Sequence, residues 1–201
     1  MDWVVTLQEE ARSGALIAAD EFAAKYRLST PTLRKALRRL ELRGLVERVT
    51  HKLYINRLNA SFSPTDLVHV LRPHSYVSLD SALEDWGIST QGTYVLTCVT
   101  TGKPRDYVTR TCKIAYSSIA AHLFFGYRKK YTRHGWYHIA EPEKALLDWV
   151  YFYRQAGVEP SLDEMDFRQV SRSKLLASGG KFPSTVLREL RPYLATAKFA
   201  A

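Results

Sequence analysis

Basic side chains with the spacing of one helical face occur between residues 31 and 43. Glu41 is the only acidic residue in this stretch, and it falls off the basic face. Guanidinium and ammonium groups on one side of a helix can reach guanine O6 and N7, or phosphates, in the DNA major groove. The pattern therefore favours contact with double-stranded DNA. The basic residues are Arg34, Lys35 and Arg38, with Arg39 beside them.

The opposite face of the same helix is apolar, which would attach the helix to a protein core. Small polar residues at its leading end would leave room for that end to enter a groove. Leu42 fits neither face, because it falls on the polar side near the helix end. The apolar residues are Leu33, Ala36, Leu37 and Leu40, and the small polar ones are Ser29, Thr30 and Thr32.

Three helices are expected around this basic face. The apolar spacing predicts helices over residues 3–12 and 21–26, and Asp20 is the expected N-cap of the second. A third helix is predicted from Pro31 to Arg43, because proline suits the first helical position. Gly44 supplies the left-handed residue that would end it.

A β-hairpin is predicted directly after the third helix. Residues 45–49 and 53–56 alternate between apolar and polar, and they flank a polar tip that contains His51 and Lys52. Three helices followed by a hairpin are typical of a winged helix-turn-helix, so residues 1–57 are predicted to be a DNA-binding domain of that type. His51 and Lys52 would then lie over the adjacent DNA backbone.

The rest of the chain predicts a mixed α+β domain over residues 64–201, joined by a polar connector. The segment 101–104 is expected to be a hairpin turn between two strands, and Ser78 is the expected N-cap of a helix. Strands are predicted at 94–100, 107–116, 124–131 and 135–139, and helices at 65–71, 79–86, 141–153, 167–176 and 184–194.

The chain carries a net charge of +9, which suggests an anionic partner such as nucleic acid. Part of this charge lies between residues 103 and 133, where eight basic residues accompany one acidic residue, Asp106. This stretch is predicted to be a second basic surface. Its basic residues are Lys103, Arg105, Arg110, Lys113, Arg128, Lys129, Lys130 and Arg133.

The two cysteines and the distribution of apolar residues indicate the compartment in which the protein is expected. Cys98 and Cys112 form no CxxC pair, and although they could face each other across a hairpin, buried free thiols are expected in a reducing cytosol. No apolar run is long enough to span a membrane, and the amino terminus lacks the pattern of a secretory signal. A cytoplasmic protein is therefore expected.

Four segments of the chain, taken in order, resemble the AbiEi antitoxins. The spacing between them also matches that family, and a winged helix precedes them there as it would here. The likeness extends to about Tyr153 and is weak beyond it. The segments are Leu71–Leu83, Thr101–Arg105, Phe124-Phe125-Gly126 and Ile139–Asp148.

The resemblance implies the antitoxin of a type IV, AbiE-like toxin–antitoxin system. Such a protein would repress its own operon by binding inverted repeats in the promoter. Its carboxy-terminal domain would counteract a nucleotidyltransferase-like toxin, generally without a stable complex. In the motif Glu141-Pro142-Glu143-Lys144, which continues to Asp148, the polar residues are expected to be mainly structural, with an antitoxic surface as the alternative.

Common catalytic layouts are missing from the sequence, which contains no GxGxxG, P-loop, GxSxG or HExxH motif. His134 and His138 have the spacing of zinc ligands on a helix, but they lie in a strand-like setting without a third ligand. No enzyme activity, metal or cofactor is therefore expected. Glu141, Glu143 and Lys144 leave a nuclease as an alternative, although Glu143 and Lys144 are adjacent rather than in the usual acid-x-Lys spacing.

A second alternative is a winged-helix regulator with a ligand-sensing carboxy-terminal domain and no toxin. It predicts an apolar pocket with a few polar groups, for which the aromatic content leaves room. No heptad repeat indicates a coiled-coil dimer, so a monomer that pairs only on inverted repeats is expected.

Overall fold

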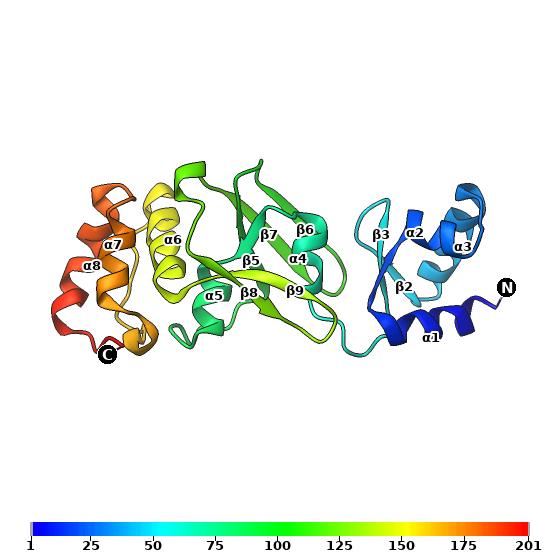
Figure 1. Cartoon of the computed structure of the whole chain (residues 1–201), viewed down its shortest axis with the longest axis horizontal. Coiled ribbons are helices and arrows are strands. Elements are labelled where there is room, and N and C mark those ends of the chain that lie inside the picture. The colour runs from blue at the N-terminus through cyan, green and yellow to red at the C-terminus, as the bar shows by residue number, and fades with distance from the viewer. Residues whose placement is uncertain (1, 201) are drawn as a thin grey trace.

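The computed structural model describes residues 2–200, which form a mixed α+β protein. An amino-terminal unit lies at one end, a six-stranded sheet occupies the middle, and the last two helices lie at the other end (Figure 1). Each end of the chain lies near one end of this elongated molecule (Figure 1).

The amino-terminal unit combines three helices with a small antiparallel sheet of order β1-β3-β2. Its apolar core lies between the helices and one face of the sheet, and includes Leu7, Phe22 and Tyr54. The elements are α1 (Trp3–Ser13), β1 (Leu16–Ala18), α2 (Ala19–Lys25), α3 (Thr30–Leu42), β2 (Val46–Arg48) and β3 (Leu53–Asn56).

Local signals determine where α3 begins and ends. Ser29 is the N-cap, and its hydroxyl accepts a hydrogen bond from the Thr32 amide. Pro31 lies in the first turn, where its missing N–H costs nothing. Gly44 follows the helix with φ of 69°, the left-handed conformation that glycine adopts easily. The expected boundaries of this helix are confirmed to within one residue.

One expectation about this unit is wrong, and one of its strands was not expected. Asp20 does not cap α2, because the helix begins at Ala19 and the Asp20 side chain instead accepts a hydrogen bond from Lys52. The sheet also has a third strand, β1, which pairs with β3 and was not expected. A strand of three residues is too short to show an alternating pattern in the sequence. Its hydrogen-bonded pairing with β3, a contact between distant segments, is what makes it a strand.

The carboxy-terminal unit is built on a mixed sheet of order β6-β7-β5-β4-β9-β8. Its strands are β4 (Ser75–Val77), β5 (Val95–Thr100), β6 (Arg105–Val108), β7 (Lys113–Ser118), β8 (Tyr127–Tyr131) and β9 (Trp136–Ala140). Its helices are α4 (Asp66–Leu71), α5 (Leu79–Asp85), α6 (Pro142–Gln155), α7 (Arg172–Gly179) and α8 (Ser184–Thr196), with short 3-10 turns at Ala121–Leu123 and Phe167–Gln169.

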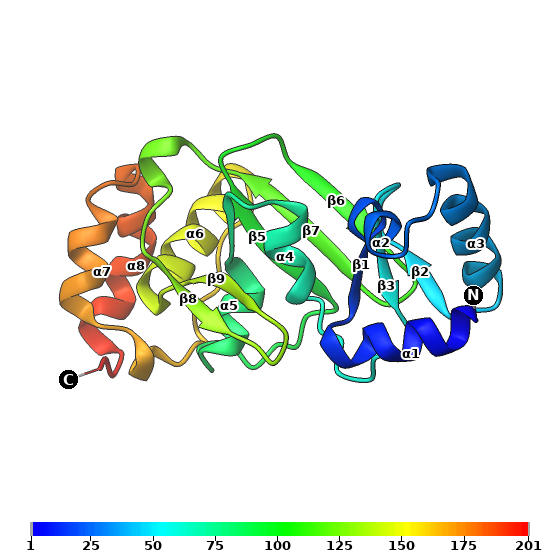
Figure 2. The ribbon, with the colours of Figure 1, turned by 45° about the vertical axis from the view of Figure 1, so that its right-hand side comes forward.

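Helices cover both faces of this sheet. On one face, the Tyr116 hydroxyl of β7 donates to the Val68 carbonyl of α4. On the other, the Tyr76 hydroxyl of β4 donates to Asp148 of α6, at 3.0 Å. Helices α7 and α8 pack against α6, on the side of α6 that faces away from the sheet (Figures 1 and 2).

Several expectations about the carboxy-terminal unit need correction. Residues 101–104 are not a hairpin turn, because β7 lies between β5 and β6. Cys98 and Cys112 do not face each other, since Cys98 is paired with Tyr116, and both thiols are free. The predicted strand 124–131 begins only at residue 127, and the predicted helix 167–176 is a 3-10 turn followed by α7.

The motif at the start of α6 contributes to the core. Lys144 and Asp148 are 1% and 0% exposed and form an ion pair, four residues apart on one helix face. Ser78, expected to cap α5, instead donates its hydroxyl to Asp148 at 2.9 Å. Gly126 has φ of 67°, and its Cα faces the Lys144 side chain so closely that an added Cβ would lie 3.2 Å from Lys144 Cβ.

Candidate nucleic-acid interface

The nine candidate DNA-contacting residues are all exposed on the amino-terminal unit. The four apolar residues of α3 are buried, so the helix is attached by one face and presents the other to solvent. Leu42, which fits neither face, is 82% exposed. The exposed candidates are Ser29, Thr30, Thr32, Arg34, Lys35, Arg38, Arg39, His51 and Lys52.

A cleft of about 480 Å³ separates α3 from the β2–β3 hairpin. Arg34 and Arg38 line it from the helix, and His51 lines it from the hairpin tip. The helix and the hairpin therefore present basic side chains to the same space, an arrangement suited to a phosphate backbone. Glu41, expected to fall off the basic face, also lines this cleft. Lys35 and Arg39 do not line this cleft.

Some of the expected contact residues already have partners within the protein. The Ser29 and Thr32 hydroxyls are hydrogen-bonded to each other at 2.8 Å, so they complete the helix cap. Lys52 forms an ion pair with Asp20 at 2.7 Å, and this contact lowers the pKa of the Asp20 carboxyl. Arg34, Arg38 and His51 are exposed and line the cleft, so a ligand in the cleft would meet their side chains.

Arg48 belongs to the same cleft but was not predicted as a site residue. It is exposed at the end of β2, and its Nε donates to the Thr50 carbonyl at 3.3 Å. Its backbone amide donates to the Glu41 carboxylate, which joins α3 to the hairpin. Side chains two residues apart in a strand lie on the same face, so Arg48 shares the face of buried Val46, and the alternation along β2 gave no signal for it.

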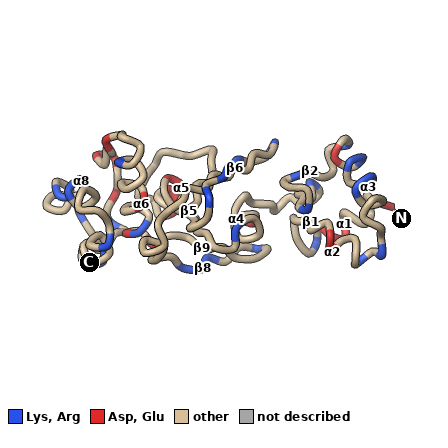
Figure 3. The backbone as a smooth tube through the Cα atoms, turned by 90° about the horizontal axis from the view of Figure 1, so that it is seen from above, with Lys and Arg blue, Asp and Glu red and all other residues tan. Residues whose placement is uncertain are grey.

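The predicted second basic surface is wrong as a single surface. Its eight residues divide between β6–β7 and β8, which lie at opposite edges of the six-stranded sheet. Lys and Arg lie along α3, near β6, along β8 and in α8 (Figure 3). The residues near β6 and β7 are Lys103, Arg105, Arg110 and Lys113, and those near β8 are Arg128, Lys129, Lys130 and Arg133.

The β8 group is held by contacts within the protein. Arg128 lies 4.5 Å from the centre of the Trp86 ring, and Lys129 Nζ lies 4.3 Å from that of Trp136. Lys130 pairs with Asp85 at 2.5 Å. These interactions orient the side chains but leave their charge at the surface, because Arg128, Lys129 and Lys130 are all exposed.

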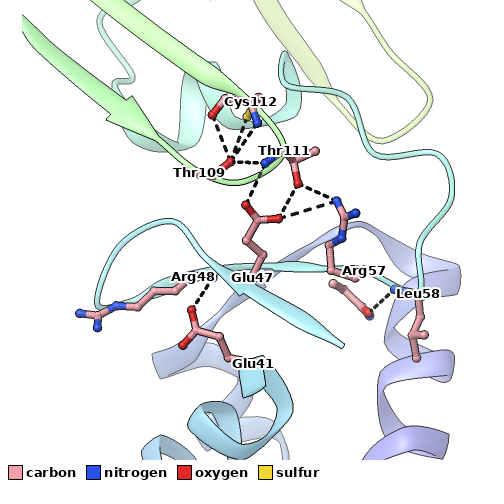
Figure 4. A network of polar contacts seen from close by, with 9 residues as sticks. Glu41, Glu47, Arg48, Arg57, Leu58, Thr109, Thr111 and Cys112 are labelled. Carbon is pink, nitrogen blue, oxygen red and sulfur yellow. Dashed lines mark hydrogen bonds and ion pairs between the residues drawn. The ribbon is translucent and has the colours of Figure 1, made fainter. Parts of the chain in front are cut away.

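The amino-terminal unit is joined to the β6 edge by a buried carboxylate. Glu47 of β2 is 8% exposed and accepts hydrogen bonds from both the amide, at 3.0 Å, and the hydroxyl of Thr111. Arg57 donates to the same hydroxyl at 2.6 Å (Figure 4). Thr111 lies in the β6–β7 turn, so this inter-unit contact joins two segments far apart in the sequence (Figure 2).

Apolar packing accompanies the inter-unit contact. In the β2–β3 register Glu47 is opposite Ile55, which is fully buried. Ile55 and Leu53 belong to the apolar core of the carboxy-terminal unit, whereas Tyr54 between them belongs to the amino-terminal core. The small sheet therefore has two buried faces, and the position of α3 is linked to the larger sheet.

Replacing Thr111 with valine will lower the free energy of unfolding by about 1.5–3 kcal/mol, because a buried carboxylate loses a charge-assisted hydrogen bond. Urea unfolding will measure this loss. Thr90, exposed and without an observed side-chain hydrogen bond within residues 2–200, provides the matched Thr90→Val control. If both variants are equally stable, the contact contributes nothing.

The same contact gives a pH dependence. Burial alone would raise the pKa of Glu47, but the polar groups of the β6–β7 turn, those of Thr111 first and then those of Thr109 and Arg110, together outweigh burial and lower it. A carboxyl whose pKa is lowered on folding stabilises the protein above its unfolded pKa of about 4.3, and loses that contribution as the pH falls through the folded value. Thr111→Val will therefore have its full effect at pH 7 and a smaller one at the acidic end.

The motif residues proposed for a nuclease or an antitoxic surface lie inside the protein. Glu143 is 6% exposed and accepts a hydrogen bond from the Ser171 amide at 2.7 Å, while Lys144 and Asp148 are occupied by each other. Glu141, at the N-cap of α6, is half-buried. Neither a partner surface nor a set of metal-binding carboxylates can be assembled from Glu143, Lys144 and Asp148.

Within residues 2–200, no three His, Cys, Asp or Glu side chains are grouped so that they could hold a metal ion. His134 lies in the β8–β9 turn and His138 in β9, so they do not share a helix. In the same range no helix has both the length and the apolar content needed to cross a membrane.

No protein-family model matches the chain, and no curated protein matches it significantly.

Proposed function

We propose that this protein is a DNA-binding transcriptional repressor that reads double-stranded DNA through a winged helix-turn-helix in residues 1–57. The observation that carries the proposal is the exposed basic face of α3 beside the β2–β3 hairpin. In this assignment α2 and α3 are the helix-turn-helix, α3 is the recognition helix, and the hairpin is the wing.

Each part of the interface has a distinct role in this proposal. Arg34 and Arg38 contact bases or phosphates in the major groove, since both line the cleft beside the wing. His51 and Arg48 lie over the adjacent phosphate backbone. The Glu47–Thr111 contact holds the wing against the carboxy-terminal unit and so limits the orientations in which both units meet one duplex.

We further propose that the protein represses its own operon and acts as an antitoxin. This part is supported by the resemblance to AbiEi antitoxins alone. The inverted repeats of the promoter are the proposed DNA target, and a nucleotidyltransferase-like toxin is the proposed partner, without a stable complex. The surface around β8 is exposed and basic, which makes it a candidate for the antitoxic role.

Fluorescence anisotropy with duplexes from upstream of the gene, and with shuffled duplexes, tests the DNA part. The expected result is a preference for the upstream duplex by about 10³-fold or more. Affinity should also fall steeply with salt, with a log–log slope of about −0.9 for each phosphate contacted. Equal affinity for shuffled DNA would contradict sequence-specific repression.

Co-expression with the adjacent gene tests the antitoxin part. If that gene arrests growth alone and co-expression restores it, the antitoxin proposal is supported. Restored growth with Arg34→Ala/Arg38→Ala would separate antitoxicity from DNA binding. A neighbouring gene that has no effect on growth would favour the alternative, a regulator that senses a ligand and has no toxin.

A further inference from the structure

A cavity of about 440 Å³ lies in the carboxy-terminal unit, away from α3. Adjacent strands supply apolar lining residues, namely Val77 of β4, Leu96 of β5 and Ile139 of β9. Tyr137 adds a buried aromatic ring, whereas Tyr94, at the rim, is fully exposed. The volume and apolar lining are those of sites that bind small organic molecules.

Most polar groups around this cavity are already engaged. Asp85 is paired with Lys130 at 2.5 Å, and Lys113 with Asp106 at 3.0 Å. Glu84 differs from them. Its carboxylate accepts a hydrogen bond from the Thr93 amide at 3.3 Å, and within residues 2–200 it forms no ion pair. A negative charge without a cation therefore borders an apolar cavity.

We propose that this cavity binds a small organic cation, an amine or quaternary ammonium with an apolar body. The apolar part would lie on Val77, Leu96 and Ile139, and the positive charge would be placed near Glu84. The aromatic ring of Tyr137 would attract a cation as well. An anionic ligand would be repelled by Glu84, whose carboxylate forms no ion pair among residues 2–200.

Tyr137 is held at the wall of the cavity. Burial, and the nearby Asp85 carboxylate, raise the pKa of Tyr137 to about 12, so its hydroxyl is neutral near pH 7, as that of an ordinary tyrosine also is. Tyr137 is 5% exposed and held in β9, which fixes the orientation of its ring.

The cavity also shares a wall with the inter-unit contact. Cys112 and Lys113 line it, and the preceding residue, Thr111, is hydrogen-bonded to Glu47 of β2. Displacement of this wall by a ligand would move the contact that holds the wing. The cation is therefore proposed to change DNA affinity, a consequence that rests on the proposed function, whereas binding itself does not.

Titration of ¹⁵N-labelled protein with benzyltrimethylammonium, followed by amide chemical shifts, tests the site. Shifts are expected at the cavity strands, and phenylacetate, an anion of similar size, should produce none there. Glu84→Gln should raise the dissociation constant at least tenfold. Glu159→Gln, which removes one exposed charge elsewhere, should leave it unchanged.

Three results would overturn the site: no cavity shifts with millimolar cation, equal binding of the anion, or equal affinity after Glu84→Gln. Duplex affinity measured with and without saturating cation then tests the coupling, which an unchanged affinity would overturn. If the cation binds but the protein binds no duplex, the proposed function fails and the cavity assignment stands.

Discussion

Arg34→Ala/Arg38→Ala will lower affinity for the specific duplex by about 100-fold or more. Each well-placed arginine contact contributes about 1–3 kcal/mol of discrimination, and both side chains line the cleft between α3 and the hairpin. Both residues are exposed, so the variant should unfold at the same urea concentration as the wild type. Gel-shift titration at two salt concentrations measures the loss.

A charge-matched control separates recognition from general attraction. Arg172→Ala/Arg188→Ala removes the same charge from exposed positions on α7 and α8, at the far end of the molecule (Figure 1). This control should bind within a few-fold of the wild type, because screening limits charge effects to about 10 Å at 0.1 M salt. Equal weakening by both double variants would mean that DNA responds only to net charge.

Asp148→Ala will lower the free energy of unfolding by about 3–5 kcal/mol, because it leaves the Lys144 ammonium buried without its counter-ion. The carboxylate also accepts hydrogen bonds from Tyr76 and Ser78, which would lose their partner. Burial lowers the pKa of Lys144 and raises that of Asp148, so each depends on the other for its charge. Urea unfolding provides the measurement.

The double variant Lys144→Met/Asp148→Ala should recover part of this loss, because no ammonium is then left buried without a counter-ion, while Tyr76 and Ser78 still lack their acceptor. Glu159→Ala, at an exposed acidic position, is the control and should change stability by less than about 0.5 kcal/mol. A loss below 1 kcal/mol in Asp148→Ala would show that water reaches the pair and screens its charges.

The sequence was sufficient for α3 because its signals are local. Ser29, Pro31 and Gly44 mark its ends, and the 3.6-residue spacing separates its buried and exposed faces. The same spacing therefore located Arg34 and Arg38 on the exposed face. Asp20 shows the limit of such reasoning. Its residue type suits an N-cap, but its carboxylate binds Lys52, which lies 32 positions away in the sequence.

Contacts between distant segments could not be predicted. The sequence places Arg105 and Arg128 in one basic stretch, but the strand order puts them at opposite edges of the sheet. In the sequence Glu47 is an ordinary charged residue of a hairpin. Its burial and its contact with Thr111 follow only from the folded arrangement of the two units. Strand order depends on connections and packing, which leave no periodic signal in the chain.

Amide chemical-shift mapping with a duplex from upstream of the gene tests the central claim most directly. The predicted shifts lie on the exposed face of α3 and the β2–β3 hairpin, including Arg34, Arg38 and His51, and disappear for the shuffled duplex. Shifts confined to β8 or to α7 and α8, with α3 unchanged, would contradict the assignment of residues 1–57 as the part that reads DNA.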